Sequence, residues 1–88
     1  MIVSVIGLGY IGLPTAAVLA SKKISVVGVD VNQHVVNVIN QGKIHIVEPE
    51  LDVLVYNSVQ NNYLKAVTKP EKADVFMVAV PTPFKDNY

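Results

Sequence analysis

Three glycines near the amino terminus constrain this chain more than any other feature. Gly7, Gly9 and Gly12 form the pattern G-x-G-x-x-G, which directly follows an apolar run from Ile2 to Ile6 and opens a segment of helical periodicity. Gly7 permits a tight turn, Gly9 lets the backbone approach a pyrophosphate, and Gly12 lets helix pack on strand. A turn without a ligand is the alternative, but it would not need three glycines at these offsets. The segment therefore predicts a strand, turn and helix that bind a pyrophosphate.

The residues after the second glycine provide the anion-binding groups. We predict a helix from Tyr10 to about Lys22, in whose first turn Pro14 is tolerated because that turn has no intrahelical acceptors to lose. The free N–H groups of Tyr10 and Ile11, together with the positive end of the helix dipole, bind an anion without a basic side chain. The helix start is therefore the predicted phosphate site.

A single carboxylate ends the next apolar run, from Ile24 to Val29. Asp30 follows Gly12 by 18 residues, close to the spacing of about 20 expected for the acid that hydrogen-bonds the adenosine ribose of a dinucleotide. A helix-capping aspartate is the alternative, but Asn32 is available as the cap. No lysine or arginine follows before Lys43, so a 2′-phosphate would meet the carboxylate without a countercharge. The sequence therefore predicts NAD, and not NADP, as the cofactor.

The rest of the chain alternates between helical and extended patterns. We expect a helix capped by Asn32 and stopped by Gly42, an extended segment from Lys43 to Val47, a helix that starts at Glu48-Pro49-Glu50, and strands at Tyr63 to Val67 and, centrally in the sheet, Val75 to Val80. This alternation implies right-handed crossovers. Residues 1–88 are thus predicted to be the N-terminal part of an α/β, Rossmann-type, doubly wound parallel sheet, with the ligand where the carboxyl ends of the strands meet.

Other polar residues are weaker candidates. Thr82 lies between two prolines at the end of the last strand and could present its hydroxyl or backbone to the ligand, although a solvated threonine also fits. His34 and His45 have no second residue at metal-ligand spacing. Glu48 and Glu50 fit a helix start better than an acid–base pair. We assign no catalytic residue and no metal site to this chain.

Composition excludes several classes of function. Seven basic and seven acidic residues cancel, and no basic cluster indicates binding to nucleic acid or to an anionic membrane surface. The absence of cysteine excludes a disulfide framework, a thiolate metal site and a cysteine nucleophile within these residues. The apolar run from Met1 to Ile6 is too short for a signal peptide or a membrane span. We therefore expect a small-molecule partner and a cytoplasmic location.

A longer string, Ser4 to Pro14, resembles the N-terminus of the UDP-glucose/GDP-mannose dehydrogenase family, and the resemblance runs essentially end to end. Three later segments resemble most the branch that acts on UDP-N-acetyl-D-mannosamine: Gly28 to His34, Ile44 to Leu51, and Ala79 to Phe84. Many relatives carry proline-isoleucine before the Glu-Pro pair, where this chain has Ile44-His45-Ile46-Val47. This difference favours the mannosamine branch.

The resemblance implies an enzyme that oxidises the C6 alcohol of a UDP-sugar to a carboxylate in two NAD-dependent steps, through an aldehyde and a cysteine thioester. Tyr10 and Ile11 match positions that contact the pyrophosphate, Asp30 matches the ribose acid, and Thr82 matches a further cofactor contact. The family's catalytic cysteine, lysine and asparagine have no counterpart here. We therefore expect the leading piece of a longer, homo-oligomeric enzyme of polysaccharide biosynthesis, inactive by itself.

Two alternatives stay open at this point. The sugar is UDP-glucose or UDP-N-acetylglucosamine in the first, because nothing in this segment is expected to touch the hexose. The second is a stand-alone nucleotide-binding module without catalysis, because glycine turns also occur in proteins that bind FAD or S-adenosylmethionine.

Overall fold

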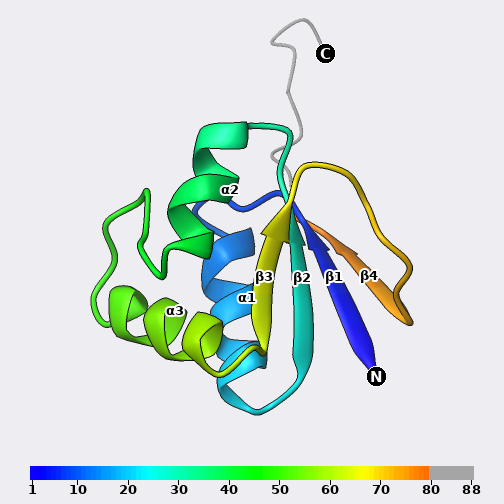
Figure 1. Ribbon diagram of the computed structural model, residues 1–88, viewed down its shortest axis with the longest axis horizontal. Helices are drawn as coiled ribbons and strands as arrows, with labels where there is room; N and C mark the ends of the chain where they lie inside the picture. The colour runs from blue at the N-terminus through cyan, green and yellow to red at the C-terminus, as the bar shows by residue number, and fades with distance from the viewer. Residues whose placement is uncertain (80–88) are drawn as a thin grey trace, which may run out of the picture.

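The computed structural model describes residues 1–79, which form one parallel sheet with helices packed on one of its faces (Figure 1). The elements are β1 (Ile2–Ile6), α1 (Gly12–Ser21), β2 (Ser25–Val29), α2 (Gln33–Asn40), α3 (Leu51–Gln60), β3 (Leu64–Val67) and β4 (Val75–Val78). All strand pairs are parallel, in the order β3-β2-β1-β4. The predicted Rossmann-type α/β fold is confirmed. Thr82 and its flanking prolines lie outside the described residues.

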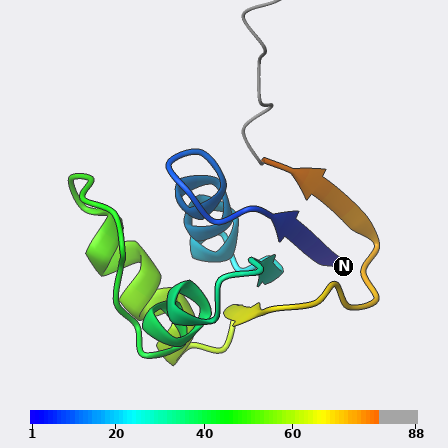
Figure 2. The ribbon, with the colours of Figure 1, turned by 90° about the horizontal axis from the view of Figure 1, so that it is seen from above.

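The direction in which the chain adds strands reverses at β1. From β1 to β3 the chain moves one way across the sheet, and all three helices lie on one face (Figure 2). The connection from β3 to β4 then crosses the opposite face, without a helix, to reach the other side of β1. Crossovers on opposite faces for opposite directions keep both right-handed. The carboxyl ends of β1, β2 and β4 therefore meet at a switch in strand order, which is where ligands bind in such sheets.

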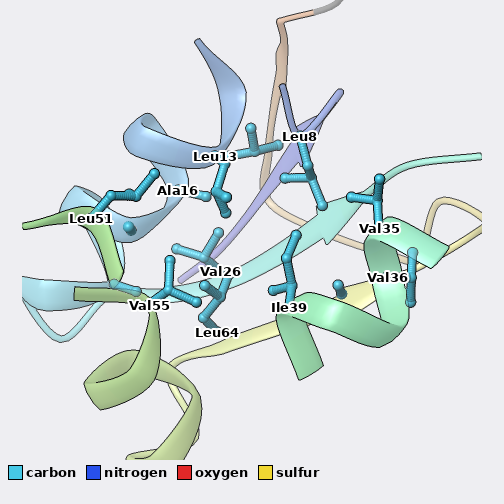
Figure 3. Packing of buried hydrophobic residues seen from close by; sticks show 14 of the residues in the cluster. Leu8, Leu13, Ala16, Val26, Val35, Val36, Ile39, Leu51, Val55 and Leu64 are labelled. Atoms are coloured by element: carbon cyan, nitrogen blue, oxygen red, sulfur yellow. The ribbon is translucent and has the colours of Figure 1, made fainter. Parts of the chain in front are cut away.

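The core lies between the sheet and α1. The helix faces the strands with a stripe of apolar residues, each at most 2% exposed: Leu13, Ala16, Ala17 and Ala20. This is the predicted helix face, and its alanines let the helix backbone approach Val3 and Val5 of β1 closely. Ile39 of α2 and Val55 of α3, both fully buried, extend the same cluster (Figure 3).

The predicted central position of the last strand is wrong for the described residues. β4 lies at the edge of the sheet, where only β1 pairs with it. Its side chains are 39–68% exposed, against 7% or less for Val26, Val27 and Val29 of β2. The apolar sequence of β4 is that of a strand buried on both faces, and sequence pattern alone does not distinguish such a strand from an edge strand whose neighbours are not among residues 1–79.

The segment before α3 also differs from expectation. Residues 43–47 bend at His45 and Ile46 and form no strand. Glu48-Pro49-Glu50 is a turn and not the start of a helix: Leu51 N–H donates to Glu48 O at 3.2 Å, and Glu50 has φ 66° and ψ −5°. Proline at the second position and positive φ at the third are typical of a type II turn. Helix α3 therefore begins at Leu51, and Asp52 is the acidic residue of its first turn.

All three helices end in the same way. The residue after each C-cap is left-handed, with φ of 66° at Lys23, 77° at Gly42 and 64° at Asn62. Lys43 N–H donates to Val38 O at 3.1 Å and Gly42 N–H to Ile39 O at 2.8 Å, and α1 and α3 repeat this pair of bonds. These are Schellman motifs, in which glycine is favoured at the left-handed position. The predicted stop at Gly42 is confirmed.

Lys23→Gly is expected to raise the free energy of unfolding by about 1 kcal/mol, because an L-residue is strained at positive φ and glycine is not. Lys23 is exposed, so little packing is lost. Gly42→Ala is the opposite control, since its Cβ would also lie 3.0 Å from Tyr56 Cδ1. Urea denaturation measures both variants. A lower midpoint for Lys23→Gly would contradict the strained geometry.

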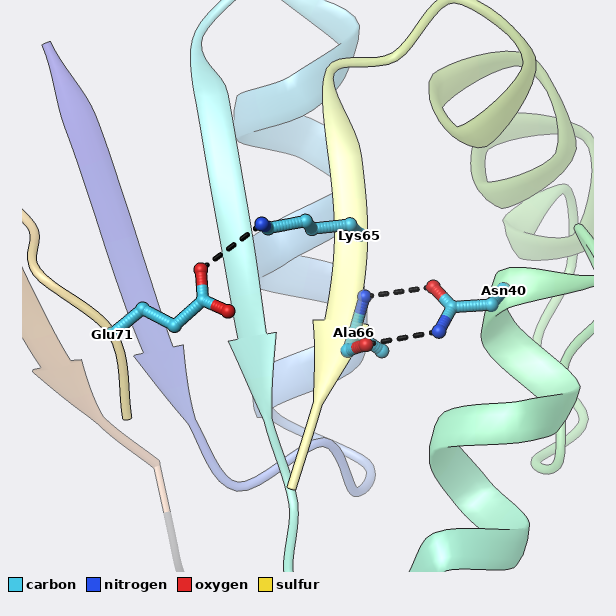
Figure 4. A network of polar contacts seen from close by, with 4 residues as sticks. All are labelled: Asn40, Lys65, Ala66 and Glu71. Carbon is cyan, nitrogen blue, oxygen red and sulfur yellow. Dashed lines mark hydrogen bonds and ion pairs between the residues drawn. The ribbon is translucent and has the colours of Figure 1, made fainter. Parts of the chain in front are cut away.

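A side chain of α2 binds the outer edge of β3. Asn40 Oδ1 accepts from Ala66 N–H at 2.8 Å, and Asn40 Nδ2 donates to Ala66 O at 2.9 Å (Figure 4). The amide thus satisfies two backbone groups that an edge strand would otherwise leave open to another chain. On the uncovered face of the sheet, Lys65 Nζ lies 3.0 Å from Glu71 Oε1, an exposed ion pair that contributes little to stability.

Asn40→Ala is expected to lower the free energy of unfolding by about 2 kcal/mol, because it leaves two backbone groups of β3 without partners. Asn37→Ala in the same helix is the matched control: both asparagines are exposed, but within residues 1–79 the Asn37 side chain only accepts from Gln33 Nε2, at 2.9 Å. We expect less than about 0.5 kcal/mol there. Equal effects of the two substitutions in urea denaturation would refute the role of Asn40.

Candidate functional site

One side of the glycine turn is held against β2, and its other side, at Gly9, has space for a ligand. Gly7 has φ 96°, which only glycine adopts readily, and its N–H donates to Val29 O at 2.7 Å. Leu8 is fully buried over β2, and a Cβ on Gly28 would lie 2.8 Å from its Cδ1. A Cβ on Gly9, in contrast, would meet no atom within 4 Å. The backbone at Gly9 is therefore accessible to a ligand, as the motif predicts.

The third glycine is required by contact within the fold. A Cβ on Gly12 would lie 1.6 Å from Gly7 O and 2.7 Å from Gly7 C. The first turn of α1 thus packs directly on the backbone at the end of β1, and no side chain fits between them. Each of the three glycines thus has a different structural role: Gly7 allows the turn, Gly9 leaves space beside the backbone, and Gly12 allows close packing. The motif predicted these three roles.

The N-terminus of α1 presents free amides to the same opening. The first helical bond of this region runs from Leu13 N–H to Gly9 O at 3.1 Å, and within residues 1–79 the amides of Tyr10, Ile11 and Gly12 have no acceptor. The regular helix starts at Gly12, two residues later than predicted, because Pro14 has no N–H to donate to Tyr10 O. The first turn of α1 contains no acidic residue, so no side chain of that turn compensates the positive end of the helix dipole.

Asp30 lies beside this turn, at the end of β2. Its Oδ2 accepts from Leu8 N–H at 3.1 Å, and its Oδ1 accepts from Asn32 N–H at 2.9 Å. Asn32 is the cap of α2, as predicted, since its side chain accepts from the amides of His34 and Val35. Asn32, and not Asp30, therefore provides the side-chain cap of α2. The bond to Leu8 was not predicted, because it depends on how close the ends of β1 and β2 lie in space.

A cavity of about 100 Å³ lies between the ends of these strands, lined by Ile6, Gly7, Val29, Asp30 and Val31. Val31 follows the carboxylate directly and is 91% exposed, so it gives this cavity an apolar side chain that was not predicted from the sequence. Ala79, the last described residue, donates its N–H to Ile6 O at 2.7 Å, so β4 ends beside the same turn. A larger cavity of about 300 Å³ lies between the amino-terminal half of the sheet and Glu71, and none of the motif residues line it.

The two histidines and the two glutamates named as weaker candidates do not join this site. His34 is exposed on α2, and His45 is partly buried in the segment between α2 and α3, where its Nδ1 has no partner within residues 1–79. Glu48 and Glu50 lie on the turn before α3. No group of three acidic or histidine side chains in the described part of the chain is placed to hold a metal ion. None of the helices up to residue 79 is long and apolar enough to span a membrane.

Comparison with known proteins agrees with this geometry. The family model described as the NAD binding domain of the UDP-glucose/GDP-mannose dehydrogenase family matches residues 1–88, the whole chain. This chain belongs to the UDP-glucose/GDP-mannose dehydrogenase family. The whole chain matches the NAD-binding domain of that family, so NAD is the cofactor of this domain.

Relatives within the family are similar over nearly the entire chain. A UDP-N-acetyl-D-mannosamine dehydrogenase from Campylobacter jejuni is 68% identical, with 98% of this chain and 21% of the relative covered. An NDP-N-acetyl-D-galactosaminuronic acid dehydrogenase from Ralstonia nicotianae is 66% identical, with 97% and 20% covered. The solved UDP-N-acetyl-mannosamine dehydrogenase of Staphylococcus aureus has a TM-score of 0.93 at 43% identity, with 98% and 21% covered. The chain thus spans about a fifth of the length of these proteins.

Proposed function

We propose that this chain is the N-terminal NAD-binding segment of a nucleotide-sugar 6-dehydrogenase that oxidises UDP-N-acetyl-D-mannosamine to UDP-N-acetyl-D-mannosaminuronate with two NAD. The observation that carries the proposal is the carboxylate of Asp30 next to a glycine turn whose helix amides are free. The names of the similar proteins from Campylobacter jejuni and Staphylococcus aureus support the sugar. We further propose that the longer protein is a cytoplasmic homo-oligomer of polysaccharide biosynthesis.

In this proposal the described residues bind and orient the cofactor and do not react. The amides of Tyr10, Ile11 and Gly12 bind the pyrophosphate, which approaches over Gly9. Asp30 accepts hydrogen bonds from the adenosine ribose, and its two oxygens have room for them, because a carboxylate has about four acceptor sites and residues 1–79 use two of them. NAD, when bound, accepts the hydride removed from the sugar in each step. We assign Thr82 a further cofactor contact.

The same site disfavours a 2′-phosphate. Asp30 is followed by Val31, Asn32, Gln33 and His34, none of which carries a fixed positive charge. A phosphate on the ribose would therefore face the carboxylate without a countercharge. The geometry thus supports NAD over NADP.

Turnover of the full-length protein with different sugars tests the substrate. The assay compares UDP-N-acetyl-D-mannosamine with UDP-N-acetyl-D-galactosamine, because the similar Ralstonia protein is named for the corresponding acid, and with UDP-glucose and UDP-N-acetylglucosamine. We expect fastest turnover of the mannosamine sugar, with two NADH formed per sugar. Faster oxidation of another sugar would show that the proposed substrate is wrong, while the proposed dehydrogenase activity would stand.

A nucleotide-binding module without catalysis is the second candidate, favoured by the absence of cysteine from these 88 residues. It predicts that the reading frame stops soon after Tyr88. A frame that continues and encodes a downstream cysteine, lysine and asparagine supports the dehydrogenase instead.

A further inference from the structure

Asp30 contacts the phosphate-binding turn itself, and not only the place where a ribose would lie. Its Oδ2 accepts from Leu8 N–H at 3.1 Å, while its Oδ1 accepts from Asn32 N–H at 2.9 Å at the start of α2. One carboxylate thus joins the residue between the first two glycines to the second helix. Resting on the function proposed above, we propose that Asp30 is a positioning residue for the pyrophosphate-binding turn in addition to its contact with the ribose.

Leu8 is the point at which the turn is held. Its side chain is 0% exposed and packs against Gly28, where even a methyl group would lie 2.8 Å from its Cδ1. Its neighbour Gly7 is bonded to Val29 O at 2.7 Å, so two successive amides of the turn donate to the end of β2. Only the second of these bonds goes to a side chain. Of the two bonds, it is the one that a substitution can remove while β2 keeps its backbone bonds.

Loss of this bond affects the next residue along the chain. Gly9 follows Leu8, and apart from its chain neighbours no atom of residues 1–79 lies within 4 Å of the position of a Cβ on it. No other contact among these residues therefore holds the outer side of the turn. Leu8 N–H is held close to the core, and within residues 1–79 Asp30 is its acceptor. Without the carboxylate, that amide must reorient toward water, and the turn moves with it. The phosphate site would then be formed less often before the ligand arrives.

Binding of two ligands to two variants of the full-length protein separates the roles of Asp30. The ligands are NAD and its analogue with 2′,3′-dideoxyadenosine, which lacks the hydroxyls that a ribose-binding acid contacts. We expect the analogue to bind Asp30→Ala about tenfold more weakly than it binds the wild type, the effect of one lost charged hydrogen bond. If Asp30→Ala and the wild type bind the analogue equally, the positioning role is wrong.

Asn32→Ala is the matched control. It removes the side-chain cap of α2 but keeps both bonds of Asp30, since Asn32 donates through its backbone N–H. Its affinity for the analogue should stay within twofold of the wild type. A loss equal to that of Asp30→Ala would attribute the effect to α2 in general and overturn the proposal.

Hydrogen exchange of the Leu8 amide in the cofactor-free protein measures how firmly the turn is held, and ribose contacts cannot contribute to it because no ligand is present. We expect faster exchange in Asp30→Ala than in the wild type or Asn32→Ala, and unchanged exchange would refute the positioning role. Should Asp30→Ala fail to fold, Asp30→Asn serves for both measurements: its amide can accept only one of the two N–H groups through oxygen. Failure of the wild type to bind NAD would refute the proposed function instead. The exchange result would still test whether Asp30 holds the turn, because it needs no cofactor.

Discussion

Gly12→Ala is expected to destabilise the protein by about 4 kcal/mol, a large fraction of the roughly 5–15 kcal/mol by which folded proteins are ordinarily stable. Its Cβ would lie 1.6 Å from Gly7 O, a backbone atom that cannot rotate away. Either α1 or the end of β1 must therefore shift, and both belong to the core that contains Leu13 and Val5. Thermal or urea denaturation of the full-length variant measures the loss.

Gly9→Ala is the matched control, because the same methyl group at this position meets no atom within 4 Å and Gly9 does not have positive φ. We expect a change in stability below about 1 kcal/mol. The new Cβ would, however, occupy the space over which the pyrophosphate approaches, so NAD affinity should fall at least about tenfold. If both alanine variants unfold equally, the separation between a packing glycine and a ligand-facing glycine is wrong.

Asp30→Ala is expected to weaken NAD binding about 100-fold, through loss of charged hydrogen bonds to the ribose and of the bond to Leu8 N–H. NADP should gain little, because removal of the carboxylate supplies no cation for the 2′-phosphate. Calorimetric titration measures both ligands. Unchanged NAD affinity in this variant would show that the ribose assignment is wrong.

Local chemistry made much of this molecule predictable. Gly7, Gly42 and Asn32 each occupy a position that one or a few residue types favour, and all three have the predicted conformation or bond. The α1 stripe was equally readable, because helical spacing fixes which residues face the sheet. Features that depend on neighbours in space could not be predicted from the sequence. The edge position of β4, the turn with left-handed Glu50 and the bond from Asp30 to Leu8 are all of this kind.

The residues of the site also fall into those that the sequence predicted and those that it did not. Sequence identified the glycine turn and Asp30, because motif and spacing reflect the needs of a dinucleotide. It did not identify Val31, since an exposed valine after a strand has no signal of its own. The roles of Tyr10, Ile11 and Asp30 toward the cofactor stay predictions, as does that of Thr82.

Side-by-side calorimetric titration of the full-length protein with NAD and with NADP tests the central claim most directly. A carboxylate at the ribose position, with no fixed positive charge in the four residues that follow it, predicts that NAD binds at least about tenfold more tightly than NADP. Equal or tighter binding of NADP would contradict the assignment of Asp30 and the account of this site.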